Sequence, residues 1–394
     1  MRSPGLVVVG ASLAGLRAVE AARKAGFEGP VTLVGAEQHL PYDRPPLSKA
    51  FLLAPHPPAS STFPTVTALD ELGLEVRLGT PAHHLDTTAH QVGVGDDTLT
   101  YSSLVIATGC TARTLPGEAP TGVHVLRTVE DAHAIRAGLD AGARTVIVGG
   151  GFIGAEVASA AHRRGLPVTI IEAAPLPLVH AVGKQMATTL ADLHTRAGVD
   201  LRCTTGVEAI TGNGRVEKVH LTDGTDLDAD LVVVGIGAAP AVDWLDGSTL
   251  TLDDGVVCDA TLRAADDIYA AGDIARWPNP LLTETMRLEH WTSAAEQGTA
   301  AGRNAVTARA AEYATVPYFW SDWYEHKIQM VGVAGTDETT IIGDPHGDKW
   351  IALYRRGDRL IGALTLNQPG RIMKLRALIA RSATWQDALE FTGA

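Results

Sequence analysis

Residues 145–172 read TVIVGGGFIGAEVASAAHRRGLPVTIIE, and this stretch decides the fold. A short apolar run leads into three glycines, a helical pattern follows as far as Ala161, and a second apolar run fills residues 168–171. This order is typical of a buried parallel strand, a helix and a second parallel strand. The spacing of Gly149, Gly151 and Gly154 matches GxGxxG. We therefore expect a βαβ unit that holds a dinucleotide pyrophosphate at the N-terminus of its helix.

Each glycine of this turn has its own reason. Gly149 permits the tight turn, Gly151 lets the backbone approach a pyrophosphate, and Gly154 allows the helix to pack closely on the strand. Glu172 closes the second strand, 23 residues after Gly149. A carboxylate there accepts a hydrogen bond from a ribose 2′-hydroxyl and repels a 2′-phosphate, so the sequence predicts NADH rather than NADPH.

A second, diverged copy of the pattern stands at the N-terminus. An apolar strand at 6–9 precedes GASLAG at 10–15, and a further strand is expected at 31–34. Ser12 replaces the middle glycine, and its hydroxyl can donate to a phosphate. Glu37 is the candidate ribose acceptor here. A further matching element follows each unit, LVIATG at 104–109 and LVVVGIG at 231–237, so the chain holds an internal repeat of two nucleotide-binding halves. The fold class is therefore α/β with two Rossmann-like domains.

Length and composition set the outer limits. The chain has 394 residues, enough for two or three domains, and a net charge of −13, which argues against a nucleic-acid partner. There is no apolar run long enough to span a membrane and no signal-peptide pattern at the start, so we expect a cytoplasmic protein without a membrane partner. Residues 53–64, rich in proline and serine, predict an irregular loop. Beyond 313–320 we expect a small α+β domain, with four short strands at 329–333, 339–342, 350–354 and 360–366 and a final helix from about residue 372. The sequence carries no signal for an oligomeric state.

Cysteine and histidine usage excludes several chemistries. Cys110, Cys203 and Cys258 stand far apart, which rules out a disulfide scaffold, a CxxC zinc site and a redox-active cysteine pair. The fourteen histidines show no metal-ligand spacing, and there is no GxSxG. We therefore expect no metal.

Taken together, the segments resemble the FAD-dependent NADH:ferredoxin reductases of bacterial oxygenase systems. The matching pieces follow the order of that family and span nearly the whole chain: GASLAG at 10–15, YDRPPLSK at 42–49, ATG at 107–109, RTVEDA at 127–132, GGGFIGAE at 149–156, GIGAAP at 235–240, YAAGDIA at 269–275, EHWTSAAEQG at 289–298 and FWSDWY at 319–324. YDRPPLSK and the EHW and WSD segments are the most specific of these.

The resemblance implies three domains: a split FAD domain at 1–112 and 241–316, an NAD domain at 113–240 and a C-terminal domain at 317–394. It also implies which residues meet the cofactors. Those expected at FAD are Gly10, Ser12, Leu13, Ala14, Gly15, Glu37, Arg44, Lys49, Ala82, Ala107, Thr108, Gly109, Arg127, Gly272, Asp273, Glu289, His290 and Trp291. Those expected at NADH are Gly149, Gly151, Phe152, Ile153, Gly154, Glu156, Glu172 and Gly237.

Two residues receive catalytic roles by this resemblance. Glu156 meets the nicotinamide carboxamide, and Lys49 lies near flavin N5, where its charge stabilises the reduced flavin. The two are expected to form a buried ion pair. Plainer interpretations stay open for five positions: an exposed first-turn acid for Glu156, a helix N-cap for Asp273, a core residue for Trp291, and solvated surface charges for Lys49 and Arg127.

The expected activity is electron transfer from NADH through FAD to a ferredoxin that serves a cytochrome P450 or a Rieske oxygenase. Flavin takes up a hydride and releases single electrons, which an iron–sulfur carrier requires. Trp320 and Trp323 lie in the stretch that resembles the partner-facing edge of the family, and a basic face is expected to steer an acidic ferredoxin. Its candidate charges are Lys327, Arg371, Lys374, Arg376 and Arg381, for which ordinary solvated side chains on a helix are an equally open interpretation. The alternatives are a rubredoxin reductase, an NADH oxidase, which the missing cysteine argues against, and a binding protein of the apoptosis-inducing-factor type.

Overall fold

The computed structural model describes residues 5–54, 69, 71–335 and 337–393. Most of the loop expected over 53–64 lies outside these residues. The described chain divides into two compact units, each built from separate stretches of sequence. The first lies within Met1–Asp43, Ser60–Thr111 and Ala239–Pro317, and the second within Arg44–Ala59, Ala112–Ala238 and Tyr318–Ala394.

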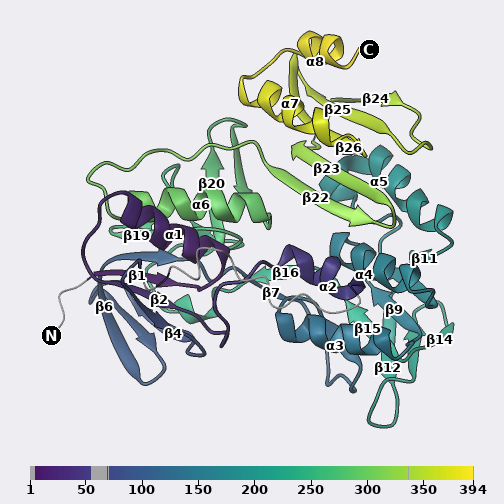
Figure 1. The fold of residues 1–394 in the computed structure, drawn as a ribbon, viewed down its shortest axis with the longest axis horizontal. Coiled ribbons are helices and arrows are strands. Elements are labelled where there is room, and N and C mark those ends of the chain that lie inside the picture. Colours follow the sequence, from purple (N-terminus) through teal and green to yellow (C-terminus); the bar gives the residue numbers. More distant parts are fainter. Residues whose placement is uncertain (1–4, 55–68, 70, 336, 394) are drawn as a thin grey trace. The chain divides into compact units, whose positions relative to one another are not determined.

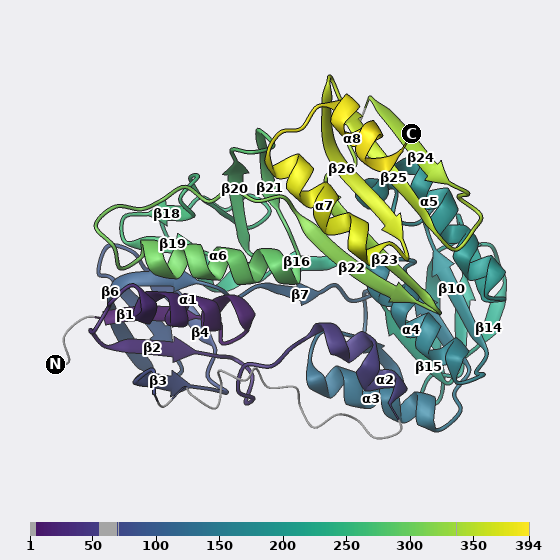
Figure 2. The same ribbon diagram turned by 45° about the horizontal axis from the view of Figure 1, so that its top comes forward.

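The first unit is built on a largely parallel sheet with the strand order β18-β19-β6-β1-β2-β3 (Figures 1 and 2). Its central strands are apolar and buried on both faces, as strands covered by helices must be. The strands are β1 (Gly5–Val9), β2 (Val31–Val34), β3 (Leu74–Arg77), β6 (Asp97–Ile106), β18 (Arg263–Ala265) and β19 (Ile268–Ala270). The strands expected at 6–9 and 31–34 are thereby confirmed, and the element expected from residue 104 begins with the last residues of β6.

Smaller elements complete the first unit. An antiparallel hairpin, β4 (Ala82–Asp86) and β5 (Gln91–Val94), extends from β6. A three-stranded sheet combines β17 (Val256–Val257), β20 (Ala275–Asn279) and β21 (Glu284–Arg287). None of these strands was predicted from the sequence.

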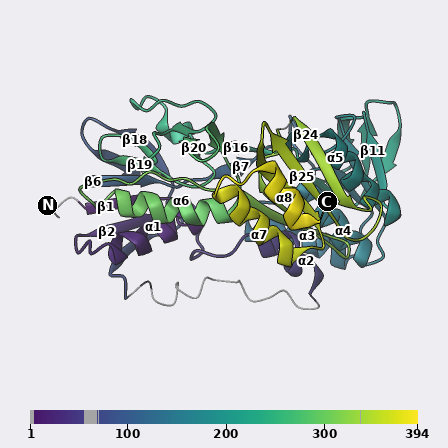
Figure 3. The same ribbon diagram turned by 90° about the horizontal axis from the view of Figure 1, so that it is seen from above.

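Two helices of the first unit lie side by side against the sheet (Figures 1 and 3). They are α1 (Leu13–Lys24) and α6 (Trp291–Asn304). Their backbones touch because α6 carries glycine at two positions one turn apart: a Cβ on Gly298 would lie 2.2 Å from the Ala14 carbonyl oxygen, and one on Gly302 would lie 2.1 Å from that of Ala18. This close packing fixes the N-termini of both helices with respect to the sheet.

The second unit repeats the arrangement with a fully parallel sheet in the order β11-β10-β9-β15-β8. The strands are β8 (Val123–Val125), β9 (Thr145–Val148), β10 (Val168–Glu172), β11 (Asp200–Cys203) and β15 (Leu231–Val234). Helices α3 (Val129–Asp140), α4 (Phe152–Arg163) and α5 (Val179–Arg196) belong to the same unit. A separate three-stranded sheet is formed by β12 (Val207–Thr211), β13 (Lys218–Leu221) and β14 (Asp226–Asp228), and an apolar cluster joins its inner side to β9 and β15.

The C-terminal segment forms an antiparallel sheet that shares a core with α4 and α5. Its order is β22-β23-β26-β25-β24, and α7 (Pro369–Ala380) and α8 (Trp385–Thr392) lie against it (Figure 2). The strands are β22 (Tyr318–Trp323), β23 (His326–Gly332), β24 (Glu338–Gly343), β25 (Trp350–Arg356) and β26 (Arg359–Leu366). Leu190 and Leu193 of α5 pack in one buried cluster with Trp323 and Trp350 of this sheet.

The predicted α/β class, with two Rossmann-like domains and an α+β tail, is confirmed. The sequence predicted four strands and one helix in the tail, and missed β22 and α8. Two short strands, β7 (Cys110–Ala112) and β16 (Ala238–Pro240), carry the chain between the units, and η3 (Asp243–Leu245) follows the second. Within the described ranges, no helix is long and apolar enough to cross a membrane.

Candidate functional site

The glycine turn of the first unit joins β1 to α1. Gly10 has φ +118°, and a Cβ there would lie 2.1 Å from the Ala107 carbonyl oxygen. A Cβ on Gly15 would lie 1.8 Å from the carbonyl oxygen of Gly10. Packing alone therefore requires both glycines. Ser12 is the N-cap of α1 in extended conformation, and Leu13 and Ala14 are buried in the first turn.

Four adjacent parallel strands of this unit end at the same edge of the sheet. Gly10 follows β1, Glu37 follows β2, residues 107–109 follow β6, and residues 272–273 follow β19. Ligands of open α/β sheets bind at this carboxyl edge. The structure thus collects the greater part of the predicted FAD positions along one edge of one sheet.

Polar groups at this edge already hold one another. The Tyr42 hydroxyl donates to Glu37 Oε2 at 2.5 Å, and the Cys110 thiol donates to Asp273 Oδ2 at 3.2 Å. No helix begins at Asp273, since a turn leads from it into β20, so its interpretation as a helix N-cap is wrong.

The remaining positions expected in this unit lie on or beside other elements. Ala82 begins β4, Glu289 and His290 lead into α6, and Trp291 is its first residue. The Trp291 indole N–H donates to Asp43 Oδ1 at 2.6 Å, and the ring stays partly exposed, so it is not a core residue.

The second glycine turn joins β9 to α4 and differs in one respect. Gly149 has φ +103° and a Cβ there would lie 2.4 Å from the Gly235 carbonyl oxygen, while one on Gly154 would lie 2.3 Å from that of Gly149. A Cβ on Gly151, in contrast, would find its nearest atom 3.8 Å away. The protein leaves open space at Gly151, the N-cap of α4, and a pyrophosphate needs that space to reach the N–H groups of the helix. The residues present therefore fit a dinucleotide.

Glu172 is held beside this turn. Its Oε2 accepts the Gly150 N–H at 2.9 Å and its Oε1 accepts the Ala174 N–H at 2.8 Å. Two large apolar side chains stay exposed near the same turn: Ile153 at 46% and Ile236 at 38%. Ile153 was predicted to bind the cofactor. Ile236 was missed, although it stands between the glycines of the quoted GIGAAP segment, next to Gly237.

The expected pair of Lys49 and Glu156 is formed. The Lys49 ammonium lies 2.8 Å from Glu156 Oε1, and the Glu156 side chain is only 4% exposed. Glu156 is therefore not an exposed first-turn acid, and at 18% exposure Lys49 is not a solvated charge. Both alternative interpretations are wrong.

Three neutral donors complete the set around Glu156. The Ser48 hydroxyl donates to Oε2, while the Ser321 hydroxyl and, at 3.4 Å, the Asp322 N–H donate to Oε1. We call Lys49, Ser48, Ser321 and Glu156 the Glu156 cluster. Its members come from the segment just before α2 (Ala50–Leu53), from α4 and from β22. The two serines were missed, although each stands inside a quoted segment, YDRPPLSK or FWSDWY.

Two arginines hold the segment that carries Lys49. Arg136 donates to the carbonyl oxygens of Phe51 and Ala54 at 2.6 and 2.7 Å, and Arg164 donates to that of Leu52. Cations at the last carbonyls of a short helix satisfy groups that have no partner within it. The 3₁₀ turn η1 (Pro45–Ser48) precedes this helix. Lys49 is thereby fixed from both sides.

Arg44 and Arg127 lie in the second unit and also contact each other. Arg44 donates to the Arg127 carbonyl oxygen at 2.6 Å, just before the capping box of α3.

Phe152, the first residue of α4, packs against Phe319, with 4.7 Å between the centroids of the two rings.

The residues predicted to face a partner separate into two groups. Trp323 is fully buried in the core shared with α5, so its predicted place at a partner-facing edge is wrong. Trp320 is partly exposed, as are Lys327, Arg371 and Arg376, while Lys374 and Arg381 are exposed. Within the described residues, no group of three or more His, Cys, Asp or Glu side chains is arranged to hold a metal ion.

Comparison with known proteins gives two family matches that together cover almost the whole chain. Residues 4–298 match the pyridine nucleotide-disulphide oxidoreductase model and residues 318–390 the reductase C-terminal model. Rhodocoxin reductase of Rhodococcus erythropolis is 36% identical, over 95% of this chain and 89% of its own length. The ferredoxin–NAD(+) reductase component of the anthranilate 1,2-dioxygenase system of Burkholderia cepacia is 38% identical, over 97% and 96%.

A solved structure agrees with these matches. Putidaredoxin reductase in its covalent complex with putidaredoxin matches with a TM-score of 0.92 and 32% identity, over 97% of this chain and 94% of that one. The resemblance drawn from the quoted segments is confirmed. The chain belongs to the pyridine nucleotide-disulphide oxidoreductase family, among the ferredoxin reductases of oxygenase systems.

Proposed function

We propose that this chain is an NADH:ferredoxin oxidoreductase that passes electrons through FAD to an iron–sulfur ferredoxin serving a cytochrome P450 or Rieske oxygenase. The observation that carries the proposal is the end-to-end match to relatives named as the ferredoxin–NAD(+) reductase components of dioxygenase systems. Both glycine turns that two dinucleotides need are formed as well.

Bound FAD accepts two electrons as a hydride and returns them one at a time. The chain's own residues supply binding and electrostatics. Residues 10–15 hold the FAD pyrophosphate at the N-terminus of α1, Glu37 accepts from a ribose hydroxyl, and Asp273 accepts from the ribityl chain. Residues 149–154 hold the NADH pyrophosphate in the same way.

Lys49 and Glu156 serve the hydride step. Glu156 accepts from the nicotinamide carboxamide on its less crowded oxygen, Oε2, where Ser48 is the single donor among the residues that the structure describes. The Lys49 ammonium stabilises negative charge that develops on the flavin. The donors on Oε1 support the proposal, because they hold that oxygen in place while Oε2 keeps an acceptor site.

The other assignments follow the same scheme. Residues 1–112 and 241–316 serve FAD, residues 113–240 serve NADH, and residues 317–394 form the C-terminal domain. The basic side chains on and after α7 steer an acidic ferredoxin, and the protein works in the cytoplasm, where NADH is supplied. Weakening of ferredoxin reduction by added salt tests the steering, because screening removes long-range attraction.

The test of the function uses the purified protein reconstituted with FAD. We expect flavin absorbance bands, bleaching of these bands by NADH without oxygen, and cytochrome c reduction that depends on added ferredoxin. A protein that stays colourless after reconstitution contradicts the cofactor assignment. Ferricyanide reduction without any ferredoxin dependence points to a different electron acceptor.

A further inference from the structure

Strand β22 of the C-terminal segment reaches the Glu156 cluster. Ser321 lies in the middle of this strand, is 0% exposed and donates its hydroxyl to Glu156 Oε1. The neighbouring Asp322 N–H points at the same oxygen. Two of the four donors on this carboxylate therefore come from a part of the chain that contains neither glycine turn.

The direction of the Ser321 hydrogen bond is set by a third side chain. The Trp323 indole N–H donates to Ser321 Oγ at 2.8 Å. Indole nitrogen is a donor only, so the serine oxygen accepts from it and keeps its own hydroxyl proton for Glu156. Trp323 is itself 0% exposed and stacks on the His194 ring, with 4.9 Å between the ring centroids. The donor is thus held rigidly and aimed at one atom.

We propose that Ser321 is a positioning residue for hydride transfer: its hydroxyl, oriented by Trp323, fixes the Glu156 carboxylate and through it the Lys49 ammonium. This inference rests on the proposed function and deepens it, since it gives the C-terminal domain a part in flavin reduction. A pair held within a fraction of an ångström keeps reacting groups in register, and a slack pair loses rate more than binding.

The chain offers a matched control. Ser159 lies on α4, one turn after Glu156, is also buried, at 4% exposure, and accepts the Tyr324 N–H of the β22–β23 hairpin at 2.6 Å. Ser159→Ala removes a hydrogen bond between α4 and the turn that follows β22 without touching the Glu156 cluster. It reports the effect of loosening the C-terminal sheet from α4.

The experiment measures anaerobic flavin reduction by stopped flow, with NADH and with NADH deuterated at the transferred position, in holoenzyme. For Ser321→Ala we expect a limiting rate about tenfold lower, as for loss of one hydrogen bond to a charged group, and an NADH Kd within about twofold of wild type. Ser321→Thr restores most of the rate because it keeps the hydroxyl, and Ser159→Ala stays within about twofold of wild type. Ser321→Cys, close in volume and a weak donor, gives an intermediate rate and serves if the alanine variant does not fold.

Two results overturn the inference while leaving the proposed function intact. One is a wild-type limiting rate and isotope effect in Ser321→Ala or Ser321→Cys. The other is an equal loss of rate in Ser159→Ala, which assigns the effect to domain packing. Failure of wild-type holoenzyme to be bleached by NADH is a different outcome and removes the proposed function itself.

Discussion

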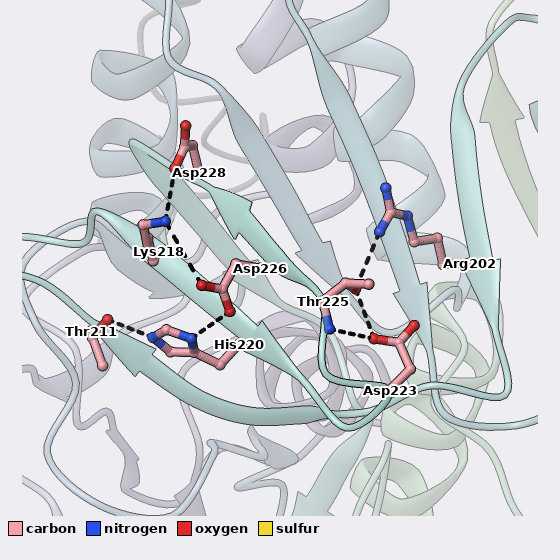
Figure 4. Close-up of polar contacts among 8 residues, drawn as sticks. All are labelled: Arg202, Thr211, Lys218, His220, Asp223, Thr225, Asp226 and Asp228. Atoms are coloured by element: carbon pink, nitrogen blue, oxygen red, sulfur yellow. Dashed lines mark hydrogen bonds and ion pairs between the residues drawn. The ribbon is translucent and has the colours of Figure 1, made fainter.

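Two polar networks in the second unit use the same chemical groups in opposite surroundings. In the Glu156 cluster, lysine and two serines surround one carboxylate that is 4% exposed. The second network, which we call the surface cluster, consists of Thr211, Lys218, His220, Asp226 and Asp228 on β12–β14 (Figure 4). His220 lies 2.7 Å from Asp226 and 2.8 Å from Thr211, and Lys218 lies 3.7 Å from both Asp226 and Asp228. The two aspartates are about half exposed.

The difference shows that burial, more than the number of contacts, separates a candidate site from a solvated face. Water solvates each charge of the surface cluster, and exposed pairs contribute about 0–1 kcal/mol. Around Glu156 the protein must replace that water with donors, and it uses four. The histidine, acid and hydroxyl row of the surface cluster therefore carries no functional assignment, despite its good distances.

Of the variants considered, Glu156→Ala is expected to have the largest effect on stability and on flavin reduction. The Lys49 ammonium is then left part-buried without its carboxylate, so we expect the free energy of unfolding to fall by roughly 3 kcal/mol, the lower end for a broken buried pair, since Lys49 keeps some exposure. Flavin reduction by NADH is expected to slow about 100-fold, as when a preorganised charged group is lost. Urea unfolding and stopped-flow spectroscopy measure the two effects.

Asp226→Ala is the control for this change, since it removes a carboxylate with similar hydrogen bonds from the surface cluster. We expect a loss below about 1 kcal/mol and an unchanged rate of flavin reduction. The double variant Lys49→Met with Glu156→Ala should regain part of the stability and none of the rate. Unchanged stopped-flow rates in Glu156→Ala would remove its proposed role.

His194 extends the comparison to pH. Its ring is 0% exposed, its Nδ1 lies 2.6 Å from the Tyr324 hydroxyl, and burial lowers the pKa of His194 to about 4. In the unfolded chain the pKa returns to about 6.5, so between these values the unfolded state binds more protons and stability falls as pH falls. The contribution is complete above about pH 7, and about 2 kcal/mol of it is lost at pH 5.

The variant His194→Gln isolates this effect, because it cannot take up the proton. The free energy of unfolding is measured for wild type and variant at pH 8 and at pH 5. We expect the wild-type value minus the variant value to be about 2 kcal/mol smaller at pH 5 than at pH 8. A difference that is the same at both pH values shows that His194 does not titrate as its burial requires.

Glu172 is intermediate in burial between Glu156 and Asp226, and two backbone N–H groups donate to its half-buried carboxylate. Its charge repels a 2′-phosphate, so Glu172→Gln should raise kcat/KM for NADPH relative to NADH by about tenfold. Steady-state rates with ferricyanide as acceptor give the ratio directly. A ratio equal to that of wild type assigns the coenzyme preference to another group.

How far the sequence predicts this structure depends on the range of the interactions involved. The two βαβ units were predicted because their signals are local: Gly149, Gly151 and Gly154 lie within a few residues of one another. The Lys49–Glu156 pair was expected only from resemblance, because its partners are more than a hundred residues apart. Ser321 and Trp323 show the remaining gap. The local sequence does not tell whether these two side chains are buried or face a partner protein, since tertiary packing alone decides which side chains are exposed to water.

Lys218→Met tests the exposed surface cluster, where we expect the smallest effect. Lys218 is 48% exposed, and its two contacts with Asp226 and Asp228 are 3.7 Å long, so each carboxylate keeps its water when the ammonium is removed. We expect a change in unfolding free energy of about 0.5 kcal/mol or less, which shrinks further in high salt, and no change in flavin reduction. A loss above about 2 kcal/mol in urea unfolding contradicts the argument, because it would mean that an exposed network stores as much energy as a buried one. If the measured change is as small as expected, the cost of removing water from the carboxylate is the property that distinguishes Glu156 from Asp226.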